Sequence, residues 1–370
     1  MFGHSACDRG GGHVADNLED RVEKVWTAAL AGDDHGAADV ALAALDDGLP
    51  PEDLLLGVLA PVQSRVGDAW AANGVTVAQE HIVTAVSERV LAAVSRHPAA
   101  RARHTEDKGR ATVACVDGEW HAFPARLLAE LLRLHGWRVD YLGPHVPTPY
   151  LPMHVNGTDA DVVALSASMP SRLPAAHAAI AACQETGKPV LAGGAAFGAD
   201  GRYAHLLGAD GWAADGLGAV EHLAGGPLRR RTRPGEAGGH RPPPAGEEFD
   251  RISGMAQDVV SSVMWKLGER LPAMAGYSRQ QLDHTTKDIG YIVEFLTIAL
   301  YVRDPELFSR FLLWMAGILT ARGVPESTLF PALDLLAGQL KDFPHALATV
   351  EHGVEVLGRE EGKDRPRHPF

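Results

Sequence analysis

With 370 residues, 46% of them apolar and 22% charged, the chain has the composition of a soluble globular protein and exceeds the size of a single hydrophobic core, so we expect two or three domains. Its formal net charge of −13 argues against nucleic acid as a direct partner, and no apolar run approaches the roughly 20 residues that span a bilayer. Three scattered cysteines, Cys7, Cys115 and Cys183, and the absence of an apolar secretory signal indicate a cytoplasmic protein without disulfides or a cysteine metal site.

The first region, residues 17–98, has apolar residues at three- and four-residue spacing in four successive segments. Short breaks of Gly, Asp and Pro separate these segments, a pattern typical of a compact four-helix bundle. The charged stretch 99–110 is predicted to be a linker.

In residues 111–225, short apolar strands alternate with helical segments, which predicts a doubly wound, flavodoxin-like parallel sheet. Ligands of such sheets bind beyond the carboxyl ends of the strands. Three groups of residues fall at those ends, so we expect them to share one edge of the sheet. They are Glu119 and His121 after the first strand, Ser166 and Ser168 at the third, and Gly193 and Gly194 at the fourth.

The remaining chain begins with a segment rich in Pro, Gly and Arg, residues 226–247, which is predicted to be a flexible linker. Residues 248–357 again show helical spacing. One helix is delimited by its capping signals, Asp304-Pro305-Glu306 at the start and Arg322-Gly323 at the end.

The loop after the first strand, DGEWHAFPAR, is the most informative segment. A dinucleotide site is disfavoured because Gly118 is its sole glycine. A catalytic role for His121 would require a partner such as Ser166 or Ser168. Metal ligation is a third possibility, because a carboxylate at Glu119 would fix the imidazole tautomer and raise its basicity for a single axial bond to a macrocycle-held metal.

The sequence Glu119-x-His121-x-x-Pro124 resembles the D/E-x-H-x-x-G motif of cobalamin-binding domains. LSAS (165–168) resembles the segment whose hydroxyl contacts the cofactor's nucleotide tail in that family, and LAGGAAFG (191–198) resembles its glycine loop. The resemblance implies that His121 binds cobalt from below in place of the cofactor's own base. Pro124 stands where the family has glycine, which suits the first turn of a helix but departs from the family's contact with the tail.

In the bundle, the segment WAANGVTVAQEH resembles the cap of the light-sensing, adenosylcobalamin-dependent repressors. The resemblance implies that Trp70 covers the adenosyl group and that Glu80 and His81 line its pocket. Ala71 departs from that group, which has a second cobalt-binding histidine there. About 16 residues precede the bundle, so we expect no DNA-binding domain of the kind the repressors carry. Methyl-carrying corrinoid proteins share the layout but lack this tryptophan spacing.

The last 110 or so residues are rich in aromatic side chains at helical spacing, which core packing or a dimer interface would explain. The alternative is a globin-like pocket for a flat pigment. Side chains on one helix face would form hydrogen bonds with its pyrrole nitrogens, and cationic side chains would pair with its propionates. Its candidate residues are Tyr277, His284, Lys287, Asp288, Tyr291, Arg310 and Trp314. Haem is the rival pigment, with His284, His345 or His352 as possible ligands.

The order of bundle, cobalamin domain and aromatic helices resembles the photocobilins, photoreceptors that pair adenosylcobalamin with biliverdin. No cysteine follows Cys183, so the resemblance implies a noncovalent bilin. We therefore expect a light sensor and not an enzyme, in which loss of the adenosyl group alters a homo-oligomer and signals to an unidentified protein partner. The alternatives are a corrinoid methyl carrier of a methyltransferase system and a cobalamin sensor whose C-terminal helices only dimerise.

Overall fold

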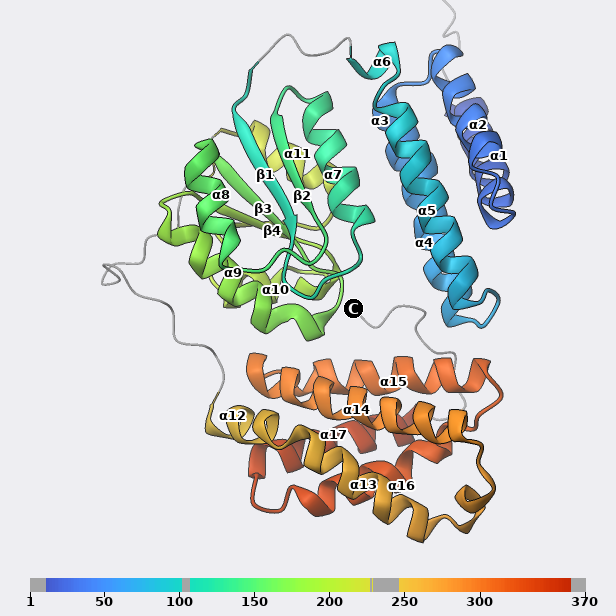
Figure 1. Ribbon diagram of the computed structural model, residues 1–370, viewed down its shortest axis with the longest axis vertical. Helices are drawn as coiled ribbons and strands as arrows, with labels where there is room; N and C mark the ends of the chain where they lie inside the picture. Colours follow the sequence, from blue (N-terminus) through green and yellow to red (C-terminus); the bar gives the residue numbers. More distant parts are fainter. Residues whose placement is uncertain (1–10, 102–106, 227, 229–245, 361–370) are drawn as a thin grey trace, which may run out of the picture.

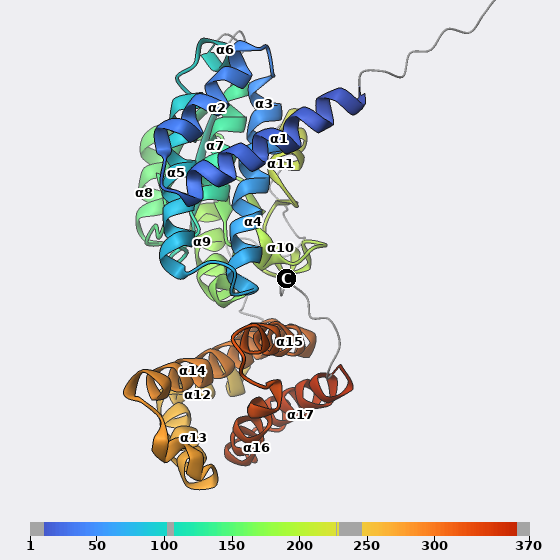
Figure 2. The same ribbon diagram turned by 90° about the vertical axis from the view of Figure 1, so that its right-hand side faces the viewer.

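The computed structural model describes residues 11–101, 107–226, 228 and 246–360. Figure 1 shows a helical bundle standing beside a sheet domain, with a second group of helices beneath both. Figure 2, turned by 90°, shows the same separation between the C-terminal helices and the two upper parts. Within the described residues, no helix has the length and apolar character needed to cross a membrane.

The N-terminal bundle is helical throughout, as predicted. The first helix begins at Gly11, earlier than the expected residue 17, and the third predicted helix is a continuous run of three segments with one π-helical turn. A capping box between Thr76 and Gln79 starts the last long helix. The elements are α1 (Gly11–Leu30), α2 (Asp34–Asp46), α3 (Pro51–Leu54), η1 (Leu55–Leu59), α4 (Ala60–Ala71), α5 (Val77–Val94) and the short α6 (Pro98–Arg101).

The middle domain is a five-stranded parallel sheet in the order β2-β1-β3-β4-β5, which confirms the predicted flavodoxin-like fold. Its strands are β1 (Arg110–Cys115), β2 (Arg138–Gly143), β3 (Val162–Ser166), β4 (Val190–Gly193) and β5 (Gly211–Ala213). Its helices are α7 (Phe123–Leu134), α8 (Tyr150–Thr158), η2 (Pro170–Arg172), α9 (Leu173–Glu185), η3 (Ala195–Phe197), α10 (Arg202–Leu206) and α11 (Gly216–Ala224).

Alternate residues of the strands enter two different hydrophobic cores, because successive side chains of a strand point to opposite faces. Val113 and Ala164 belong to a core that includes α7, α11 and the N-terminal bundle. Ala114 and Leu165 belong to a second core, which runs through α8 and α9 into the C-terminal helices without interruption. The sheet domain therefore shares one core with each neighbour.

The C-terminal part is all-helical, as predicted. Helix α15 starts and ends where its capping signals indicate, with Asp304 accepting from the Glu306 amide and Arg322 at the C-cap. The predicted linker 226–247 lies almost wholly outside the described residues. The elements are α12 (Glu247–Gly254), α13 (Ala256–Arg270), η4 (Pro272–Gly276), α14 (Arg279–Val302), α15 (Pro305–Ala321), η5 (Glu326–Thr328), α16 (Leu329–Gln339) and α17 (Pro344–Arg359).

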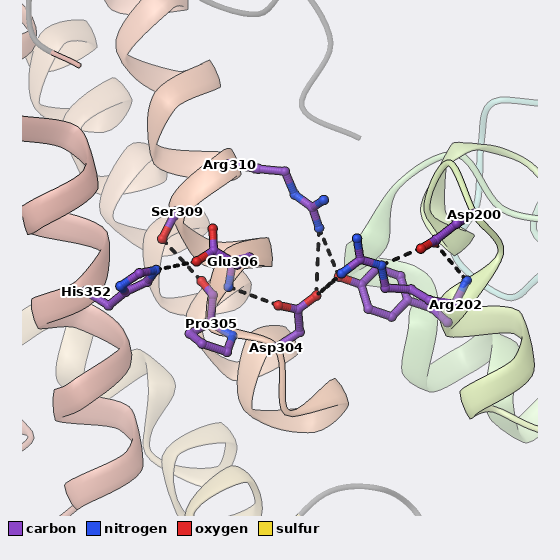
Figure 3. A network of polar contacts seen from close by, with 9 residues as sticks. Asp200, Arg202, Asp304, Pro305, Glu306, Ser309, Arg310 and His352 are labelled. Carbon is purple, nitrogen blue, oxygen red and sulfur yellow. Dashed lines mark hydrogen bonds and ion pairs between the residues drawn. The ribbon is translucent and has the colours of Figure 1, made fainter. Parts of the chain in front are cut away.

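Polar contacts join the sheet domain to these helices. Figure 3 shows Asp304, at the start of α15, receiving bonds from the α10 side of the interface and lying close to Arg310. Arg202 Nη1 lies 3.2 Å from an Asp304 carboxylate oxygen, and the Tyr203 hydroxyl donates to the same oxygen. Arg310 in turn donates to the Tyr203 hydroxyl over 3.0 Å.

Candidate functional site

The loop between β1 and α7 lies at the carboxyl edge of the sheet and is organised around Glu119. This side chain is only 1% exposed, yet it accepts four hydrogen bonds. One carboxylate oxygen accepts from the backbone N and from Nδ1 of His121, at 2.8 and 2.6 Å. The other accepts from the backbone N atoms of Ser168 and Met169, at 2.7 and 3.1 Å. Glu119 thus ties the loops after β1 and β3 together.

Electrostatics keep this buried carboxylate ionised. Burial acts to raise the pKa of Glu119, but the hydrogen bonds from His121 and from the Ser168 amide outweigh it and hold the pKa below its usual range. The bond to Glu119 raises the pKa of His121, against the opposing effect of burial. The negative charge of Glu80 in the N-terminal bundle adds to that increase.

The imidazole of His121 is bonded at one ring nitrogen and open at the other. Its Nδ1 is fixed by Glu119, none of the described residues bonds its Nε2, and the side chain is 58% exposed. A neutral imidazole whose Nδ1–H is held by a carboxylate presents a lone pair at Nε2. The predicted Glu119–His121 pairing is therefore present, with the geometry that ligation requires.

The other two sheet ends lie beside this loop. The Ser166 carbonyl accepts from the Val116 amide, and Ser168 acts on Glu119 through its backbone amide. Gly194 has a φ of 102°, and a Cβ there would lie 2.3 Å from the Ala167 carbonyl oxygen. This glycine is thus required by the close approach of β3 and β4.

In the N-terminal bundle, the predicted cap residues gather at one end, around the turn between α4 and α5. Trp70 lies in the last turn of α4 and is half-buried. Glu80, in the first turn of α5, accepts from the Thr84 hydroxyl and lies 3.4 Å from Nδ1 of His81. The His81 side chain is 75% exposed. Both members of the predicted Glu80–His81 pair thus lie at this end of the bundle.

The candidate pigment residues separate into two groups. His284, Lys287 and Tyr291 lie exposed on α14, with Asp288 half-buried on the same helix. Tyr277 is also exposed and precedes that helix.

Arg310 and Trp314 were predicted to line the same pocket, but α15 uses both for contacts between domains. Arg310 bonds to Tyr203 in the sheet domain, so its pairing with a pigment carboxylate is not supported. The Trp314 ring lies 6.3 Å from that of Trp70. These partners are distant in sequence, which is why helical spacing on α15 did not indicate them.

Two cations beside the candidate site were not predicted. Arg172 of η2 lies over the motif loop, where a Cβ on Gly118 would meet its guanidinium at 2.7 Å, and its side chain also pairs with Glu294 of α14 at 3.6 Å. Arg322 lies over the Trp70 ring, with its Cζ 5.1 Å from the centroid. No local pattern indicates either contact, because each joins segments that are distant in sequence.

The candidate haem ligands do not converge. His345 and His352 form ion pairs with Glu248 and Glu306 on the surface, at 2.7 and 2.6 Å. No group of three or more His, Cys, Asp or Glu side chains suited to a metal ion occurs in the described part of the chain. Burial raises the pKa of the thiols of Cys115 and Cys183 to about 12, so neither is a reactive thiolate.

The comparisons with known proteins agree with this geometry. Residues 109–223 match the family model described as B12 binding domain, and residues 21–95 match a second model with the same description. The chain therefore contains a cobalamin-binding domain with its helical cap. A curated relative is the HTH-type transcriptional repressor CarH of Myxococcus xanthus, 34% identical over 148 residues, which are 39% of this chain and 46% of that protein. The chain spans about half the length of that relative.

Two solved structures are also similar to this chain. The monomethylamine corrinoid protein of Methanosarcina barkeri is 19% identical, with a TM-score of 0.49, over 55% of this chain and 96% of that one. A cobalamin-binding protein from Desulfitobacterium hafniense DCB-2 is 16% identical, with a TM-score of 0.33, over 56% of this chain and 97% of that one.

Proposed function

We propose that this protein is not an enzyme but a light-sensing receptor that binds adenosylcobalamin. The observation that carries the proposal is the exposed imidazole of His121, held at Nδ1 by the buried Glu119 carboxylate and bonded at Nε2 by none of the described residues, in a chain whose helical bundle bears Trp70 and Glu80. The partial similarity to the CarH repressor supports the adenosyl form of the cofactor. When bound, adenosylcobalamin would supply a cobalt–carbon bond that visible light breaks.

Each residue of the site has a distinct role in this proposal. His121 would hold the cobalt through Nε2, and Glu119 fixes the ring in the required tautomer and orientation. The lack of a side chain at Gly194 lets the loops after β3 and β4 approach closely, at the edge where the nucleotide tail would pass. Trp70 would pack against the adenosyl group, and Glu80 would supply a hydrogen-bond acceptor for its ribose. A change in the packing of Trp70 would then alter the assembly of the protein.

The C-terminal helices are proposed to hold biliverdin without a covalent bond. The supporting feature is the face of α14 that carries His284, Asp288 and Tyr291, on a helix that packs against α15. No cysteine follows Cys183, so no thioether can form in this domain. The output would be a change of oligomeric state that a partner protein recognises.

Absorption spectroscopy of the full chain tests the cobalamin site. Loaded with adenosylcobalamin in the dark, the protein should show the spectrum of histidine-ligated cobalamin and change irreversibly on illumination. His121→Ala should give the spectrum of cobalamin without a lower nitrogen ligand, or lose the cofactor. His222→Ala, at an exposed position of α11, is the matched control and should behave as the unmodified protein. A histidine-ligated spectrum in His121→Ala would refute the assignment.

The bilin is tested with biliverdin added to the full chain, because the C-terminal helices share a core with the sheet domain. A red band should appear, and acid denaturation should release all of the pigment. Tyr291→Phe should shift the band, whereas Trp265→Ala, on the surface of α13, should not. The absence of any bilin uptake would favour helices that only dimerise.

A further inference from the structure

The indole of Trp70 contacts the C-terminal helices. Its ring centroid lies 6.3 Å from that of Trp314, with the planes inclined at 40°. The guanidinium carbon of Arg322 lies 5.1 Å from the same ring, within the range of a cation–π interaction. Both neighbours come from α15 and its C-cap, and α4 and α15 are in contact. The position of Trp70 therefore depends on α15 and its C-cap as well as on the bundle.

Trp314 is itself anchored in the core of the C-terminal domain. Its ring lies 6.2 Å from that of Phe311, and Phe311 stacks on Phe295 with centroids 3.8 Å apart and planes inclined at 8°. Both phenylalanines are 1% exposed. A row of four aromatic rings thus runs from the interior of the C-terminal domain to Trp70. Because packed interiors are stiff, the row restricts the movement of its outermost ring.

Arg322 is held in a similar way. One of its terminal nitrogens donates to the Ile318 carbonyl oxygen over 3.1 Å, which satisfies the end of α15. Burial lowers the pKa of Arg322, and the nearby charge of Asp288 partly offsets this effect. The charge of Asp288 on α14 therefore helps to keep Arg322, which lies over Trp70, in its cationic form.

The location of this contact distinguishes it from an ordinary docking contact. Trp70 lies in the last turn of α4, and Glu80 lies in the first turn of α5. Figure 1 shows the turn between α4 and α5 at the end of the bundle nearest α15. The C-terminal helices thus reach the bundle at the end that carries the proposed cap residues.

We propose that Trp314 and Arg322 are positioning residues that fix the indole of Trp70, so that the C-terminal domain determines which upper-face group the cobalamin site accepts. This inference rests on the proposed function, since it assigns Trp70 to the upper face. Loss of either contact allows Trp70 to leave the position that favours an adenosyl group over a methyl group. The preference should fall by about tenfold for Trp314→Ala and about threefold for Arg322→Ala.

The test uses the full chain and two measurements. The first, on cofactor-free protein, is far-ultraviolet circular dichroism, in which two indoles at this separation and angle give an exciton couplet. The second is the ratio of the dissociation constants for methyl- and adenosylcobalamin. Trp314→Ala should lose the couplet and the preference, and Trp314→Phe should lose the couplet while retaining most of the preference. Trp265→Ala, an exposed tryptophan of the same domain, should change neither.

The outcomes separate this inference from the proposed function. If Trp314→Ala removes the couplet but leaves the preference intact while Trp70→Ala abolishes it, Trp314 only docks the domains, and the receptor function stands. If Trp314→Ala leaves the couplet unchanged, the two indoles are not neighbours, and the inference is overturned. If the unmodified protein has no preference for adenosylcobalamin, both proposals fail together.

Discussion

Replacing Glu119 by glutamine tests the central feature of the site. The carboxylate serves two pairs of donors, the backbone N and Nδ1 of His121 on one oxygen and the amides of Ser168 and Met169 on the other. The single oxygen of a glutamine can serve only one pair, while its NH2 group points donors at the other. If the NH2 group faces the amides of Ser168 and Met169, the cost is about 2–4 kcal/mol, at about 1–2 kcal/mol for each unsatisfied donor.

The opposite orientation of the glutamine is also unfavourable for ligation. With its NH2 group facing His121, the ring must accept at Nδ1 and carry its proton on Nε2. The nitrogen that would bind cobalt is then blocked. In both orientations Glu119→Gln should weaken cobalamin binding, although the side chain has the same size and shape.

Amide hydrogen exchange of the cofactor-free protein provides the measurement. If the glutamine NH2 group faces Ser168 and Met169, protection of their amides should fall by about 30- to 700-fold, which corresponds to 2–4 kcal/mol of local stability. If its oxygen faces them, their protection is retained and only cobalamin binding weakens. Glu80→Gln, which changes a carboxylate bonded to the Thr84 hydroxyl, is the control and should leave both amides protected. Unchanged protection together with unchanged cobalamin affinity in Glu119→Gln would refute the reasoning.

Three further changes test other parts of the structure. Tyr203→Phe removes a hydroxyl bonded to the Asp304 carboxylate at the start of α15 and should lower the free energy of unfolding by about 1–3 kcal/mol in thermal melting. Unchanged stability would show this interface bond to be dispensable. Gly194→Ala places a Cβ 2.3 Å from the Ala167 carbonyl oxygen at positive φ, so denaturation should show the free energy of unfolding lowered by about 3 kcal/mol or more. The control Gly187→Ala, where the space is open, should lower it by about 1 kcal/mol, and equal losses would count against the steric argument. Burial acts to raise the pKa of Glu248, but bonds from the first turn of α17 hold it below the unfolded value. Glu248→Gln should therefore lower the free energy of unfolding by about 1 kcal/mol at neutral pH, and this difference should shrink as the pH falls below about 4. A difference independent of pH would contradict this account.

The sequence was most informative where structure depends on local pattern. The alternation of strands and helices places His121, Ser166 and Gly193 at the carboxyl ends of parallel strands, whose common edge follows from the fold class. The caps of α15 were readable because the signals at Asp304 and Arg322 act within one turn.

Partners from distant segments could not be predicted in this way. Periodicity shows that Trp314 and Arg310 share a stripe of α15, but not that one meets Trp70 and the other meets Tyr203. The role of Ser168 was missed for a different reason. Its contribution is a backbone amide, which every residue except proline carries, so the side chain gives no signal.

The uninterrupted core between the sheet domain and the C-terminal helices limits how such a chain can be recombined in evolution. His177 of α9 bonds to the Tyr301 hydroxyl at 2.7 Å, and both side chains are buried. A foreign helical module joined after the sheet domain would cover His177 without that hydroxyl, at a cost of about 1–3 kcal/mol. It would also have to supply a carboxylate opposite Tyr203. A cobalamin-binding protein with another C-terminal module therefore inherits α9 and α10 together with that module, or has to rebuild their outer surface.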